Sequence, residues 1–359
     1  MRRLLSGILI AAVLLAALLA LAVRQPAVQD RILERVVNTV VGRSPEVPVE
    51  DALAAWLLGS SGPLPHATRG GPSVAVFAAG RFFVVDVGRG SANRLALARV
   101  DGSRIGGVLL THFHSDHIAE LGEWDLQTWV AGRAAPLRVF GPPGIERVVA
   151  GFEEAYALDA GYRTEHHGAD FLPEAVGRMA AHPVVGPAEG GGPSVVLEEE
   201  GLRITAFAVD HAPIRPAYGY RFDYRGRSVV VSGDTVRDDG LVAAARGADV
   251  LFHEAQANHI VERIGAAASA AGRPGPARIM ADIPDYHTTP VEAARIANEA
   301  GVKLLVFYHL TPPPPVALLE RIYVRGVDAV RKDGWLLGED GLLVVLPGGS
   351  DAVELRHLD

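Results

Sequence analysis

After residue 50, the chain alternates between short apolar runs and longer stretches in which apolar residues recur every three or four positions. The runs are typical of buried strands, and the longer stretches are typical of amphipathic helices. This alternation predicts an α/β fold in two halves, each a sheet covered by outer helices, with a helical insertion at 151–179 between them. Residues 265–276, rich in glycine and proline, are interpreted as a loop. Strands are expected at 74–77, 82–85, 108–110, 137–140, 194–197, 202–209, 218–224, 228–231, 250–252 and 303–307.

The N-terminus carries the longest apolar run. Residues 4–23 are apolar except for Ser6 and Gly7, and at about 1.5 Å per residue a helix of this length can cross a bilayer. An Ala-Leu-Ala sequence at its end also suits signal-peptide cleavage, so 1–23 is expected to be a signal anchor or a signal peptide, and the length favours the anchor. Arg2 and Arg3 predict an N-terminus in the cytoplasm. The remaining chain is then expected at the cell membrane outside the cytoplasm, or secreted or periplasmic.

Residues 24–50 are expected to connect this segment to the main domain. Val28, Ile32 and Val36 recur with helical spacing among charged residues, which predicts an amphipathic helix followed by a linker. The following residues, 51–359, are expected to form one large domain. The composition agrees, since 49% of residues are apolar and only 21% are charged, so a substantial core can be buried.

A cluster of candidate metal ligands follows the apolar run at 105–110. The sequence Thr-His-Phe-His-Ser-Asp-His places four of them close together: His112, His114, Asp116 and His117. In an extended strand His112 and His114 point the same way, and the turn that follows brings the other two beside them. Imidazole and carboxylate groups suit Zn²⁺ and its first-row neighbours, and the chain has no cysteine for a softer metal. The cluster therefore predicts a metal centre.

Three further candidate ligands stand at the ends of other apolar runs: His211, Asp234 and His309. Together with the loop they make seven, enough for two ions. A serine nucleophile is not favoured, because neither Ser115 nor Ser232 lies in the G-x-S-x-G elbow that such a nucleophile requires.

Around these candidates lies a series of short motifs. It begins with an apolar strand and glycine turn at 57–65 and continues at 69–73, 86–90, 111–117, 219–221, 232–235, 253–255 and 287–289. In this order the motifs resemble those of the metallo-β-lactamase fold hydrolases, specifically the ribonuclease Z-like branch, which also includes zinc arylsulfatases and phosphodiesterases. The resemblance extends from about residue 57 to the C-terminus. It implies a metallo-β-lactamase fold, which is a four-layer αββα sandwich, here with an N-terminal transmembrane or signal helix.

The resemblance also implies a position for each ligand. His112, His114 and His211 would hold one zinc ion, Asp116, His117 and His309 would hold the other, and Asp234 would bridge the two. Two such ions about 3.5–4 Å apart share a hydroxide and polarise a phosphoryl or acyl oxygen, so that water is the nucleophile. Mn²⁺ or Fe would suit the same ligand types.

Three side chains are expected to act in catalysis: Asp116, Glu254 and His287. In the resembling branch, Glu254 would keep His287 charged so that the imidazole protonates the leaving oxygen. A second interpretation stays open for His287, because the residues after it, Thr289 and Pro290, are typical of a helix start.

Two other polar positions have open interpretations. Asp86, after the run at 82–85, is either a carboxylate that orients a ligating imidazole or a turn former at a strand end. His166 and His167 are interpreted first as exposed residues, although a place at the mouth of the site is also open.

The substrate is expected to be small. A ribonuclease Z is expected to carry a tRNA-grasping arm between the motifs at 219–221 and 232–235, yet Arg221 and Ser232 are only 11 positions apart. The formal net charge is −8, and cleavage after Ala22 would leave 32 basic against 42 acidic residues, so the average charge attracts a polyanion poorly. We therefore expect an exported or membrane-anchored, zinc-dependent hydrolase of a small phosphodiester or sulfate ester, with no nucleic acid as partner.

Two other activities stay open at this point. One is that of a tRNA 3′-end endonuclease of the ribonuclease Z type, and the other is hydrolysis of a lactone or carboxylic ester. A metal-binding protein without activity is disfavoured because every expected ligand is present. A homodimer is also left open.

Overall fold

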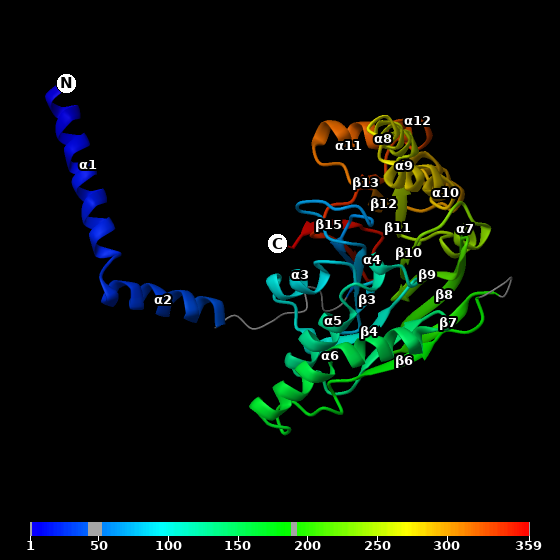
Figure 1. Cartoon of the computed structure of the whole chain (residues 1–359), viewed down its shortest axis with the longest axis horizontal. Coiled ribbons are helices and arrows are strands. Elements are labelled where there is room, and N and C mark those ends of the chain that lie inside the picture. The colour runs from blue at the N-terminus through cyan, green and yellow to red at the C-terminus, as the bar shows by residue number, and fades with distance from the viewer. Residues whose placement is uncertain (1, 42–51, 188–191, 359) are drawn as a thin grey trace. The chain divides into compact units, whose positions relative to one another are not determined.

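The computed structural model describes residues 2–41, 52–187 and 192–358 (Figure 1). The chain divides into two compact units, Met1–Glu46 and Val47–Asp359. The expected N-terminal segment and amphipathic helix both fall in the first unit, and the candidate ligands all fall in the second.

The N-terminal unit consists of two helices, α1 (Arg2–Ala22) and α2 (Pro26–Val41). Pro26, which has no backbone N–H, is the first residue of α2, where that donor is not needed. Among the described residues no single helix is both long and apolar enough to cross a bilayer, and only Gly7–Ala22 and Pro26–Thr39 together, bent by 81°, reach that length and hydropathy. The expected transmembrane or signal helix is therefore not supported, and the location of the chain stays a prediction.

The larger unit contains two sheets. The first has eight strands in the order β15-β14-β1-β2-β3-β4-β5-β6. β1 pairs antiparallel with both β14 and β2, so the beginning and the end of this unit meet in one sheet. Its strands are β1 (Ala52–Gly59), β2 (Ser73–Ala78), β3 (Arg81–Val85), β4 (Ile105–Leu109), β5 (Leu137–Gly141), β6 (Met179–Pro183), β14 (Leu342–Pro347) and β15 (Glu354–His357).

The second sheet has seven strands in the order β13-β12-β11-β10-β9-β8-β7. The strands of this sheet that come first in the sequence, β7 to β10, form an antiparallel meander. The strands from β10 to β13 are parallel. Its strands are β7 (Ser194–Glu199), β8 (Leu202–His211), β9 (Ile214–Tyr224), β10 (Arg227–Val231), β11 (Val250–Gln256), β12 (Leu304–Thr311) and β13 (Trp335–Leu337).

An apolar core joins the facing sides of the two sheets. Leu57 and Val76 of the first sheet belong to the same buried cluster as Tyr220 and Val306 of the second. Two further buried clusters cover the outer faces and include residues of the helices. The predicted αββα sandwich is thus confirmed. On the first sheet lie α3 (Ser91–Leu97), α5 (Leu121–Val130) and α6 (Ile145–His167), and on the second α7 (Asp239–Ala244), α10 (Pro290–Glu299), α11 (Ala317–Tyr323) and α12 (Val327–Val330).

The prediction of a loop at 265–276 is wrong. These residues belong to α8 (Asn258–Ala270) and α9 (Pro274–Asp282), which are separated by a short turn. The segment is rich in alanine, the residue with the highest helix propensity, and this outweighs the cost of Gly265. Pro274 stands at the first position of α9, where proline is well tolerated.

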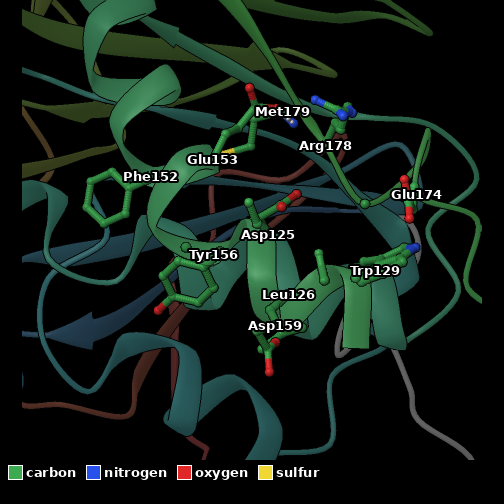
Figure 2. Close-up of a pocket in the computed structure, with 15 residues that line it drawn as sticks. Asp125, Leu126, Trp129, Phe152, Glu153, Tyr156, Asp159, Glu174, Arg178 and Met179 are labelled. Carbon is green, nitrogen blue, oxygen red and sulfur yellow. Dashed lines mark hydrogen bonds between the residues drawn. The ribbon is translucent and has the colours of Figure 1, made fainter. Parts of the chain in front are cut away.

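A buried ion pair fixes the end of α5 beside a pocket of about 120 Å³, which Figure 2 shows between α5, α6 and the segment before β6. Asp125 lines this pocket, and its Oδ1 lies 2.8 Å from a guanidinium nitrogen of Arg133. Arg133 also donates to Thr128 Oγ1 and to the carbonyls of Val176 and Arg178. Burial raises the pKa of Asp125, whereas Arg133 opposes that rise.

We expect the substitution Arg133→Met to lower the free energy of unfolding by about 3–5 kcal/mol, because it leaves the Asp125 carboxylate buried without a partner. Urea denaturation followed by tryptophan fluorescence measures the loss. The matched control is Arg163→Met, whose ion pair with Asp159 is exposed on α6 and should contribute about 0–1 kcal/mol. Equal effects of the two substitutions would contradict the prediction.

Candidate metal centre

The candidate ligands come from both sheets. In the first sheet, β4 ends just before the loop that carries His112 and His114 and continues into the short helix α4 (Ser115–Ile118), which carries Asp116 and His117. In the second sheet, one ligand ends β8, one follows β10 and one lies near the end of β12. These are His211, Asp234 and His309. Because β8, β10 and β12 run in the same direction, their carboxyl ends lie at one edge of the second sheet, and the ligands of both sheets come together there.

The first group of ligands surrounds one face of Asp234. His112 Nε2 and His114 Nδ1 lie 2.9 Å apart, and the Nε2 atoms of His112 and His211 each lie 3.8 Å from Asp234 Oδ2. One ligand atom from each of these four residues lies within 4.8 Å of the others. Four nitrogen and oxygen atoms at this spacing match the donor set of a zinc site.

The second group lies on another side of the same carboxylate. Asp116 Oδ2 is 3.7 Å from His117 Nε2 and 3.3 Å from His309 Nε2. Both of these Nε2 atoms are also 3.3 Å from Asp234 Oδ2. Asp234 is therefore the one carboxylate among the described residues that contacts members of both groups.

Unpaired polar atoms at this centre test whether it fits metal ions. His117 Nε2, His211 Nε2 and Asp234 Oδ1 are buried without a hydrogen-bond partner in the part of the chain that the structure describes. Buried polar atoms are nearly always paired. Three unpaired atoms within one small cluster are accounted for if each binds an ion, so the residues present fit two metal ions.

The electrostatics of the centre agree with this fit. Burial and the neighbouring imidazole of His117 hold the pKa of His112 well below its usual range, so that His112 is neutral as a metal ligand must be. Burial alone would raise the pKa of Asp234, but His309 and His117 hold it well below its usual range. For His117, burial alone would lower the pKa, but the carboxylates of Asp234 and Asp86 raise the pKa of this imidazole well above its usual range. The carboxylates therefore attract positive charge to this position, which a divalent cation supplies.

Hydrogen bonds on the far side of two imidazoles fix their orientation. His117 Nδ1 lies 2.8 Å from Asp86 Oδ2, and the same carboxylate accepts hydrogen bonds from the backbone N–H and the hydroxyl of Thr111. Asp86 also has a φ of 56°, a turn conformation, so both of its interpretations hold. His211 Nδ1 donates to the carbonyl of Tyr286 at 2.9 Å. Each bond turns the Nε2 atom of its imidazole toward the centre.

Glu254 and His287 lie next to the second group. His287 Nδ1 is 3.1 Å from Glu254 Oε1, which also accepts from the backbone N–H of Thr288 at 2.9 Å. Burial lowers the pKa of His287, but Glu254 raises it to about 9. The ring stacks at 5.6 Å on that of His309. Thr289 forms a capping box with Glu292, so the helix start and the contact with the centre occur together.

Some contacts of the centre could not be inferred from the motifs. The Tyr286 carbonyl is a backbone group that any residue supplies, and no sequence signal identifies it. Gly62 lies in the glycine turn after β1, which the sequence motif did indicate. A Cβ at this position would overlap Thr311 Oγ1 and lie 3.1 Å from the His309 ring, so only glycine leaves room for the imidazole. His166 and His167 end α6 as exposed residues, and no ligand group found among the described residues includes them.

Comparisons with known proteins agree with this geometry. Residues 82–310 match the family model of the beta-lactamase superfamily domain. A ribonuclease Z of Mycobacterium bovis is 39% identical over 263 residues, which cover 72% of this chain and 86% of that protein. A ribonuclease Z of Mycolicibacterium gilvum is 37% identical over 259 residues, covering 71% and 83%. The crystal structure of the short form of human tRNase Z matches with a TM-score of 0.57 at 21% identity, covering 82% of this chain and 99% of that chain, a likeness of fold.

These relatives correct the expected partner. They are named for a ribonuclease, which contradicts a small ester substrate without nucleic acid, and they give no support to an arylsulfatase. The net charge misled because it averages the whole surface, whereas binding depends on groups beside the site. Arg295, which is exposed, lines a cleft that also includes His287. The chain belongs to the β-lactamase superfamily, and the two relatives described above are named ribonuclease Z.

Proposed function

We propose that this protein is a metal-dependent endonuclease of the ribonuclease Z type, which hydrolyses a phosphodiester bond near the 3′ end of precursor tRNA. One observation carries the proposal: Asp234 lies 3.3–3.8 Å from imidazole nitrogens of both ligand groups, as a carboxylate shared by two ions must. The identity of 39% to a ribonuclease Z over most of that protein supports the choice of substrate.

Each residue has an assigned part in this proposal. The first ion would be held by His112, His114 and His211, the second by Asp116, His117 and His309, and both by Asp234. When bound, two zinc ions supply Lewis-acid polarisation of the phosphoryl oxygen and lower the pKa of water toward neutrality.

The Glu254 and His287 pair would deliver a proton. Glu254 Oε1 lies 3.1 Å from His287 Nδ1, so that nitrogen is engaged and Nε2 is the atom left to hold a proton for the leaving oxygen. Backbone N–H groups of Thr288 and Thr235 fix the same carboxylate oxygen. The carboxylate can therefore orient the imidazole without moving itself.

The absence of a long arm affects how RNA would be held. β9 and β10 are joined by a tight hairpin, in which Tyr224 pairs with Arg227, so the predicted lack of room for an arm is confirmed. RNA must then be bound by surfaces nearer the metal centre.

The test is cleavage of a precursor tRNA transcript with a 3′ trailer by the zinc-loaded full chain. We expect one discrete cut that releases the trailer, and no cut in a transcript whose acceptor stem is disrupted. A protein that binds two zinc ions per chain and leaves the intact precursor uncut would contradict the proposal.

A further inference from the structure

A cleft of about 510 Å³ opens beside His287. Its walls come from four segments: the loop after β10, which supplies Arg237; the start of α8, which supplies Asn258; the segment before α10, which supplies Pro284, His287 and Thr289; and α10 itself, which supplies Glu292 and Arg295. The volume is within the range of small-molecule sites. Because the ring of His287 also contacts those of His211 and His309, the cleft lies next to the metal centre.

Most polar groups of this cleft already have partners. Arg237 pairs with Asp239 at 2.8 Å and with Glu299 at 3.0 Å. The Asn258 amide donates to the carbonyl of Pro284 and accepts from Gln256. Glu292 closes the capping box at the start of α10. These groups hold the walls in place and are not free to bind a ligand.

Arg295 differs from them. It is exposed, and no hydrogen bond or ion pair of its guanidinium is found among the residues that the structure describes. It stands one turn after Glu292 on α10, an element whose inner face is buried by Ala293, Ala294 and Ile296. The cleft therefore contains a guanidinium without a counter-ion on a rigid helix, and a guanidinium binds phosphate well through two parallel hydrogen bonds.

We propose that this cleft is a subsite for the RNA backbone, in which Arg295 binds a phosphate next to the scissile one. The inference rests on the proposed function, because an RNA strand with its scissile phosphate at the metal centre passes His287 and continues into the cleft. Because β9 and β10 are joined only by a hairpin, a contact in this cleft supplies part of the RNA binding that an arm would otherwise provide. Arg295 is a binding residue in this proposal and takes no part in proton transfer.

Direct binding tests the subsite independently of cleavage. A fluorescein-labelled RNA oligonucleotide with phosphorothioate linkages is titrated with zinc-loaded full chain, and fluorescence anisotropy gives Kd over a series of KCl concentrations. For Arg295→Ala we expect Kd to rise roughly tenfold and the slope of log Kd against log salt to fall by about 0.7, the value for one phosphate contact on a single strand. Arg295→Lys should keep most of the slope, because it keeps the charge.

The matched control is Arg203→Ala on β8, an exposed arginine whose partner is Glu198 and which does not line the cleft. It should bind RNA as the wild type does. An Arg295→Ala variant with wild-type Kd and wild-type slope would overturn the subsite, as would equal losses in both alanine variants. If binding depends on Arg295 but the precursor tRNA is not cut, the subsite stands and the proposed cleavage function fails.

Discussion

Replacing Asp234 by alanine is expected to abolish cleavage and to remove at least one zinc ion per chain. The carboxylate is 2% exposed, and its Oδ2 lies within 3.8 Å of four imidazole nitrogens drawn from both ligand groups. No nearby side chain replaces it, because Asp116 contacts only the second group. We expect kcat/KM to fall by at least on the order of a thousandfold, since both ions act together on the phosphoryl group.

Zinc content by atomic absorption and the rate of precursor tRNA cleavage measure these two effects. The matched control is Asp223→Ala on β9, which removes a partly exposed carboxylate paired with Arg221 and should leave two zinc ions and the rate unchanged. If Asp234→Ala retained both ions and full rate, Asp234 would not be the shared ligand, and the assignment of the two groups would fail.

Replacing Glu254 by glutamine is expected to lower kcat by about 10²–10⁴, the usual contribution of general acid catalysis, while both zinc ions stay bound. The substitution keeps the size of a fully buried side chain but removes the charge that faces His287. His287→Ala should cause a similar loss, and the double variant should lose little more than either single variant, because residues that act as one unit are not additive.

Zinc content separates this role from an alternative at the same place. One nitrogen of His287 lies within 4.8 Å of ligand atoms of Asp234 and His309, so the same position also suits a metal ligand. Loss of zinc in His287→Ala would assign it to the metal and not to proton transfer. Independent losses that multiply in the double variant would likewise contradict a paired role. Glu262→Gln on α8 is the control for a glutamate outside the centre and should keep the wild-type rate.

The metal loop could be predicted from the sequence because its chemistry is local. Four candidate ligands crowded into one turn after a buried strand strongly favour a bound metal, and His211, Asp234 and His309 follow from their places at strand ends. The contacts behind them depend on tertiary structure. The Tyr286 carbonyl reaches His211 across 75 positions of sequence, and a local pattern does not contain such a pairing.

The errors have physical causes of the same kind. The N-terminal helix is a different case: α1 ends at Ala22, close to the end of the predicted apolar run, and a membrane span has no support beyond a helix pair bent by 81°. Composition suggested a loop at 265–276, where alanine propensity and the position of Pro274 favour helices. The substrate was misjudged because a net charge of −8 says nothing about one free guanidinium, that of Arg295, beside the centre.

The origin of the ligands in two separate sheets has a further consequence. Bound ions would connect the loop after β4 in the first sheet to the ends of β8, β10 and β12 in the second. An ion that binds only the folded domain stabilises it by about 2.7 kcal/mol when the free ion concentration is a hundred times Kd. The lifetime of this protein against proteases should therefore follow the cell's zinc supply, and zinc starvation would deplete the enzyme itself as well as its activity.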